Sequence, residues 1–132
     1  MDSPVPNSFW DCLDELVASH PLVIDRPRGS RHPRYPELLY PLDYGYLEGT
    51  TSTDGGGIDV WLGTSRNRSL PQMKMKHLSA VILTADLHKH DAEIKIMLNC
   101  SEEELQTVLG FHNDLKFIRA ILIRRPTDME IS

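Results

Sequence analysis

The stretch YPLDYGYLEGTTSTDGGGIDVWL, residues 40–62, decides the fold of this chain. Its glycine-rich centre is typical of a turn, and the residues on either side favour two short strands, the second at residues 58–62. Further apolar, β-branched runs predict short strands at residues 22–25, 80–84, 94–98 and 117–123. Because the strands are short and closely spaced, we expect a mainly β (α+β) fold, a small closed β-barrel with helices packed outside it.

Two helices and one long loop complete the expected domain. Asn7-Ser8 has the chemistry of a helix N-cap ahead of the amphipathic stretch FWDCLDELVASH, which predicts an N-terminal helix within residues 1–20. Ser101 and Glu104 form a capping box, so a second helix is predicted to start there. Residues 27–43 are rich in proline and arginine, which predicts an extended loop. We expect one domain over residues 1–132.

The composition limits the possible function classes. Fourteen basic and nineteen acidic side chains give a net charge of −5, which disfavours a nucleic-acid or membrane-surface binder. An OB-like nucleic-acid binder is disfavoured further, because no basic-aromatic surface pattern is present. The start MDSPVPNSFW does not resemble a signal peptide, and Cys12 and Cys100 fit reduced thiols. We therefore expect a cytoplasmic protein without membrane or nucleic-acid partners.

Four aspartates lie in two polar turns, each beside an apolar strand. Asp54 and Asp59 flank the glycine turn, and Asp86 and Asp91 flank the sequence LHKH. If the two turns are neighbours in space, the four carboxylates converge and need a cation, and oxygen ligands favour Mg²⁺, Mn²⁺ or Ca²⁺. The alternative is that Asp54 serves only the turn and Asp91 is an ordinary loop acid.

The chain resembles the soluble, Mg²⁺-dependent inorganic pyrophosphatases of the β-barrel type, known as family I. The resemblance covers residues 22–113 and is most specific around residues 40–60. It implies an OB-like closed barrel and hydrolysis of pyrophosphate to two phosphates. The residues that carry it are Ile24-Asp25-Arg26-Pro27, Arg34-Tyr35, Tyr40-Pro41, Tyr44-Gly45-Tyr46, Asp54, Asp59-Val60, Asp86 and Asp91.

The resemblance also implies roles for individual residues. Asp54, Asp59 and Asp91 match the ligands of the tightest metal ion, and Asp86 matches a ligand of additional ions. The expected cofactor is Mg²⁺, with Mn²⁺ or Co²⁺ as substitutes. Residues expected to contact the phosphates of a small anionic substrate are Tyr44, Arg34 and His112, with Asp25 in the outer shell of the site.

The chain departs from the family pattern at the proton acceptor. The aspartate that activates the nucleophilic water in the family is replaced by Gly56. His88, His90 or Glu93 could take over that proton, which makes the catalytic base unknown. His88 and His90 could alternatively bind zinc or be solvated loop residues.

Three readings of function follow from these departures. The first is a divergent, shortened pyrophosphatase-like hydrolase, and the second is a hydrolase for a different phosphoanhydride or phosphoester. The third is a catalytically impaired relative that binds a metal, a phosphate or a partner protein. The family resemblance also suggests a homo-oligomer, for which Phe9, Trp10 and Leu13 of the N-terminal helix are available. A basic cluster forms either an anion clamp over the site or a solvated surface, and its members are Arg26, Arg28, Arg31 and Arg34.

Overall fold

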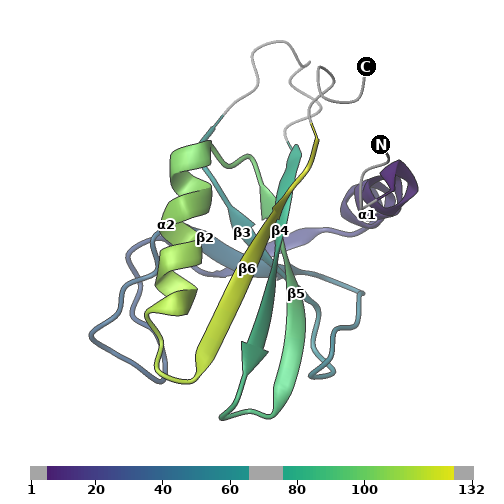
Figure 1. The fold of residues 1–132 in the computed structure, drawn as a ribbon. Helices are drawn as coiled ribbons and strands as arrows, with labels where there is room; N and C mark the ends of the chain where they lie inside the picture. Colours follow the sequence, from purple (N-terminus) through teal and green to yellow (C-terminus); the bar gives the residue numbers. More distant parts are fainter. Residues whose placement is uncertain (1–5, 66–75, 127–132) are drawn as a thin grey trace.

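A computed structural model describes residues 6–65 and 76–126 of the chain. These residues form a mixed sheet of six strands with two helices (Figure 1). The elements are α1 (Asn7–Ser19), β1 (Leu22–Arg26), β2 (Asp43–Leu47), β3 (Ile58–Leu62), β4 (Leu78–Asp86), β5 (Asp91–Leu98), α2 (Glu102–Asn113) and β6 (Ile118–Arg124). The mainly β fold with flanking helices is thus confirmed. Neither described helix is long and apolar enough to cross a membrane.

The sheet has the strand order β1-β2-β3-β5-β4-β6. All neighbouring strands are antiparallel except β3 and β5, which run parallel and bring Asp59 opposite Lys95. Among the described strands, β1 pairs only with β2 and β6 pairs only with β4, so hydrogen bonds do not close the sheet. The predicted closed barrel is therefore not confirmed. The edge strand β1 is short, its register is irregular between Ile24 and Arg26, and Pro27 ends it.

The two faces of the sheet carry separate cores, because side chains alternate along each strand. On one face, Val60 of β3 and Ile96 of β5 pack with apolar residues of α1. On the other face, Trp61 and Met97 pack with Leu105 and Val108 of α2. Figure 1 shows α2 lying along the sheet and α1 on the far side of β4 and β5. The same alternation that buries Met97 on the α2 face places the polar residues of β5 on that face.

The N-terminal helix is confirmed, with a different start. It begins at Asn7 directly after Pro6, so the predicted N-cap residues lie inside its first turn. Pro6 has no side chain that could accept a hydrogen bond, whereas proline is well tolerated at a helix start. Arg125, just after β6, donates two hydrogen bonds of 2.8 Å to the carboxylate of Asp14, which ties the helix to the sheet.

The second helix starts as predicted from its capping box. The Ser101 hydroxyl accepts a hydrogen bond from the Glu104 backbone N–H, and the Glu104 carboxylate accepts one from the Ser101 N–H. The same carboxylate accepts hydrogen bonds from the backbone and hydroxyl of Thr64, which follows β3. Glu104 therefore fixes α2 against the end of β3, and His112 near the other end of α2 is held over the sheet.

Candidate functional site

A cavity of about 540 Å³ opens on the α2 face of the sheet, where the apolar core gives way to polar residues. Its floor is formed by β2, β3, β4 and β5, one wall by residues 111–118, and the opposite wall by the loop that follows β1. It is lined by Asp25, Arg26, His32, Pro33, Arg34, Tyr35, Tyr40, Tyr44, Gly45, Asp59, Trp61, Thr84, Asp86, Lys89, Glu93, Lys95, Phe111, His112, Leu115 and Ile118.

Lys95 is the central charge of the floor. Its Nζ atom donates hydrogen bonds of 2.9 Å to the Asp59 carboxylate and to the Tyr44 hydroxyl, and its side chain is only 9% exposed. Burial raises the pKa of the Tyr44 phenol above its ordinary value, and the neighbouring Asp59 carboxylate raises it further. Tyr44 therefore stays a neutral hydroxyl, and Lys95 and Asp59 form a partly buried ion pair beside it.

Lys89, Asp91 and Glu93 continue this pattern of charges toward the β4–β5 turn. The Lys89 ammonium lies 3.6 Å from Asp91 and 3.7 Å from Glu93, and Lys95 lies 4.0 Å from the same Glu93 carboxylate. Burial raises the pKa of Glu93, against the opposing positive charge of Lys95. Within the described residues, Asp91 Oδ1 and Glu93 Oε2 are buried without a hydrogen-bond partner. Acids and ammonium groups thus alternate along the floor, but their hydrogen bonds are incomplete.

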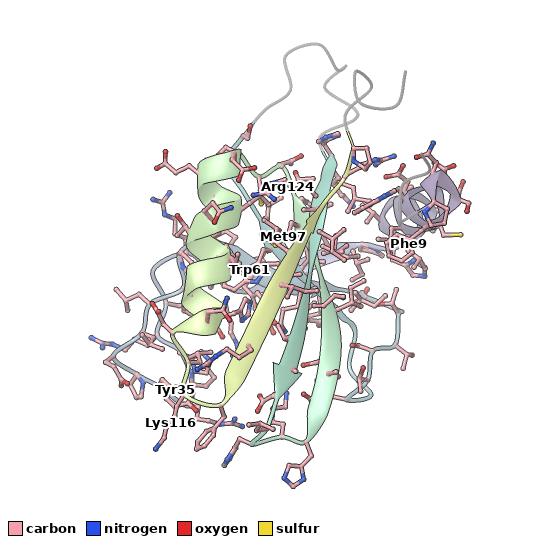
Figure 2. All side chains as sticks on the ribbon, in the orientation of Figure 1. Phe9, Tyr35, Trp61, Met97, Lys116 and Arg124 are labelled. Carbon is pink, nitrogen blue, oxygen red and sulfur yellow. The ribbon has the colours of Figure 1, made fainter. Side chains whose placement is uncertain are left out.

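An aromatic cluster forms the end of the cavity next to the core. Trp61, which is fully buried, contacts Tyr40, Tyr44 and Phe111 with ring centroids 4.6–5.6 Å apart. Figure 2 shows Trp61 in the layer between the sheet and α2. Its indole N–H donates a hydrogen bond of 3.1 Å to Nε2 of His112. This acceptor role requires a neutral imidazole with its proton on Nδ1.

Burial lowers the pKa of His112 to about 3, with a further contribution from the positive charge of Lys95. His112 is therefore neutral at physiological pH, and it lines the cavity as a hydrogen-bonding group without charge.

The end of β1 and the loop after it place two arginines, Arg26 and Arg34, at the cavity. Arg26 donates a hydrogen bond of 2.8 Å to the Tyr40 hydroxyl. His32 stacks on the Tyr40 ring and accepts hydrogen bonds from the backbone N–H groups of Arg34 and Tyr35. Burial lowers the pKa of His32, as do the charges of Arg26 and Arg34. A neutral His32 thus anchors the loop and holds Arg34 at the rim.

The structure does not gather the four aspartates predicted to bind metal. Asp54 is exposed, lies outside the cavity lining and accepts a hydrogen bond from the Gly56 N–H within its own turn. Asp86 lines the cavity, but its Oδ1 atom accepts hydrogen bonds from the backbone N–H groups that follow it. Asp59 is paired with Lys95, and Asp91 lies close to Lys89.

The side chains as placed do not fit the divalent cation that the resemblance implies. Over residues 6–65 and 76–126, no three His, Cys, Asp or Glu side chains lie close enough together to hold a metal ion. The ammonium group of Lys95 stands against Asp59, where that ion was expected. The unpartnered oxygens of Asp91 and Glu93 are the only hard acceptors of this kind among the described buried side chains.

The other predicted residues divide into two groups. Tyr44, Arg34, His112, Asp25 and Glu93 all line the cavity, as their predicted roles require. The candidate bases His88 and His90 are exposed in the β4–β5 turn and lie outside the lining, as does Gly56.

Sequence reasoning did not assign site roles to Lys89 and Lys95, and it offered Arg26 only as one member of a possible anion clamp. The signal for Lys95 is the period of two along β5, which places it on the same face as Asp91 and Glu93. That period identifies Lys95 as a site residue only once it is known that this face of β5 lines the cavity and that β3, which carries Asp59, is its neighbour in the sheet.

Comparisons with known proteins agree with this architecture. No model of a known protein family matches the chain, and no curated protein sequence matches it. Solved structures do match: an inorganic pyrophosphatase from Coxiella burnetii aligns with a TM-score of 0.54 at 14% identity, covering 75% of this chain and 81% of that one. The inorganic pyrophosphatase from Helicobacter pylori aligns with a TM-score of 0.55 at 14% identity, over 83% and 85% of the two chains.

A protein from Anaplasma phagocytophilum described as an inorganic phosphatase aligns with a TM-score of 0.54 at 14% identity, over 78% of this chain and 82% of that one. These likenesses show that the chain has a pyrophosphatase-like fold. The residues around the cavity then decide what can be proposed about function.

Proposed function

We propose that the cavity binds a small anion that contains phosphate, with pyrophosphate as the first ligand to test. The observation that carries this proposal is the placement of Arg34 at the rim. Among the described residues, no hydrogen bond or ion pair involves its guanidinium, while its backbone is held by His32. A guanidinium with its N–H groups available is the group best suited to grip a phosphate through two hydrogen bonds.

The charges around the cavity are compatible with an anionic ligand. Four acidic side chains and four basic ones line it, which gives no net charge (4 − 4 = 0), and both lining histidines are neutral. The ammonium groups of Lys89 and Lys95 offset the carboxylates of the floor, and Arg34 at the rim adds a positive charge that can attract an anion. Tyr44 adds a partly buried hydroxyl, and His112 adds an imidazole whose Nδ1–H is not used by Trp61.

The experiment is a calorimetric titration of the purified chain with pyrophosphate. We expect Arg34→Ala to weaken binding about tenfold, the usual scale for one charge-assisted contact. Arg28→Ala is the matched control, because Arg28 belongs to the same loop, is exposed and lies outside the cavity lining. Equal losses in both variants would refute a specific role for Arg34. No binding of pyrophosphate or inorganic phosphate by the unmodified chain would refute the proposal.

A second candidate function is hydrolysis of the phosphoanhydride, as in a divergent Mg²⁺-dependent pyrophosphatase. The observation that favours it is Glu93, whose side chain is only 6% exposed at the floor and whose carboxylate has an oxygen without a hydrogen-bond partner among the described residues. A carboxylate with a raised pKa is a suitable general base for a water molecule. Glu93 on β5 would then supply the general base that the chain lacks at Gly56.

A phosphate-release assay separates hydrolysis from binding alone. Pyrophosphate is incubated with the chain and Mg²⁺, Mn²⁺ or Co²⁺, with Asp59→Asn as the control. If hydrolysis occurs with Glu93 as the base, Glu93→Gln should lower the rate about 10²–10⁴-fold. Phosphate release no faster than that of Asp59→Asn with all three ions would rule out hydrolysis of this substrate.

A further inference from the structure

The Lys95 ammonium is a feature of the cavity that the similarity to pyrophosphatase structures does not explain. It lies 2.9 Å from an Asp59 oxygen, at the carboxylate for which the sequence predicts a metal ion. Its side chain and that of Glu93 are both more than nine-tenths buried. A charge in such surroundings is retained only when it is paired and hydrogen-bonded, as Lys95 is.

We propose that Lys95 serves as the built-in cation of this cavity, so that the chain binds its anion without a divalent metal ion. The first half of this proposal, charge neutralisation of the floor by Lys95, stands on the contacts alone. The second half, contact with the anion, rests on the proposed function.

The hydrogen-bonding capacity of the ammonium group supports contact with an anion. A lysine ammonium has three N–H groups. Asp59 and Tyr44 accept two of them, while the nearest Glu93 oxygen lies 4.0 Å away, beyond hydrogen-bond range. One N–H therefore remains for a ligand oxygen in the cavity that Lys95 lines.

The neighbouring carboxylates explain why a metal ion has little to bind. Asp54 is outside the lining, and one carboxylate oxygen of Asp86 is occupied by two backbone hydrogen bonds, so among the described residues neither joins Asp59 in a cluster that could hold a metal ion. A divalent ion at Asp59 would lie against the ammonium, and two like charges at such a distance repel strongly in a partly buried site. The metal and Lys95 therefore compete for Asp59.

The first test compares the unmodified chain with and without metal. Pyrophosphate binding is measured by calorimetry in EDTA and again in excess Mg²⁺, after correction for the complex that Mg²⁺ forms with free pyrophosphate. We expect dissociation constants that agree within about twofold, because no metal ion contributes to the site. Binding at least tenfold tighter in Mg²⁺ would overturn the proposal.

The second test removes the ammonium. Lys95→Met is compared with Lys76→Met. Lys76 is an exposed residue just before the start of β4, at the end of that strand opposite to Asp86, so the control removes the same charge away from the cavity. We expect pyrophosphate binding in EDTA to weaken at least tenfold in Lys95→Met and to change less than about twofold in Lys76→Met. Unchanged binding in Lys95→Met would show that Lys95 is only structural and would overturn the proposal.

A third measurement keeps this inference separate from the proposed function and needs no variant that might fail to fold. The melting temperature of the unmodified chain is recorded in EDTA and with Mg²⁺ or Mn²⁺, without pyrophosphate. A metal that binds only the folded state raises the melting temperature, so we expect no metal-dependent rise. A clear rise would overturn the built-in cation, whereas absence of pyrophosphate binding in every condition would refute the proposed function.

Discussion

The buried imidazole of His112 gives a prediction whose size follows from the structure. In the folded chain its pKa is lowered from 6.5 to about 3 by burial and by Lys95. Between these values the unfolded chain binds a proton at this residue and the folded chain does not. The contribution of His112 to the free energy of unfolding is therefore fully present above about pH 6.5 and is lost as the pH falls toward 3.

This change in pKa lowers the free energy of unfolding by about 1.4 kcal/mol for each pH unit between 6.5 and about 3, and by about 5 kcal/mol in total once the pH is below both pKa values. This is a large part of the 5–15 kcal/mol that is typical for the stability of a domain. Protonation would also remove the acceptor of the Trp61 N–H and place a second positive charge near Lys95.

The assay is urea unfolding followed by tryptophan fluorescence at several pH values between about 7 and 4, for the unmodified chain and for His112→Gln. Glutamine keeps an acceptor for Trp61 but does not titrate. Between about pH 7 and 4 the variant should therefore lose about 2–3 kcal/mol less unfolding free energy than the unmodified chain. Glu93, whose raised pKa gives the opposite slope, is present in both proteins and cancels. His90→Gln, in the exposed β4–β5 turn, is the control. Parallel pH profiles for the unmodified chain and His112→Gln would refute the reasoning.

Two further predictions concern the framework that holds the cavity. Gly45→Ala should destabilise the chain by about 1–3 kcal/mol in urea unfolding, because a Cβ atom at this position would overlap the backbone of Val23 on the paired strand β1. Equal stability of the variant and the unmodified chain would contradict the close contact between these two backbones. Glu104→Ala should cost about 1–2 kcal/mol through loss of the capping box and of the hydrogen bonds to Thr64, whereas Glu103→Ala, an exposed neighbour in the same turn, should change the unfolding free energy by less than about 0.5 kcal/mol.

Much of the fold could be predicted because local rules are strong in this sequence. The capping box at Ser101 and Glu104 specifies a helix start by itself, and β-branched runs specified where most strands lie. Closure of the sheet could not be predicted in the same way. Periodicity shows which face of a strand is apolar, but it does not show whether two edge strands pair.

The candidate site was predictable in its location and less so in its chemistry. Asp59 and Asp86 do line one cavity, because each lies on a strand whose neighbour in the sheet is β5. Asp54 lies outside it, because its carboxylate closes a local turn with Gly56, the alternative that turn chemistry had left open. A short side chain with a backbone donor two residues away satisfies that donor before any distant partner.

The parallel pairing of β3 with β5 is what changes the interpretation of the site. This pairing places Lys95 opposite Asp59, although the two residues are 36 positions apart in the sequence. An acid that the sequence assigned to a metal site thus becomes one partner of an ion pair. Because the floor is neutralised from within the sheet, selection among anions falls to the rim, where His32 holds Arg34. Changes in the loop after β1 should therefore alter which anion binds, while changes on β5 should alter whether any anion binds.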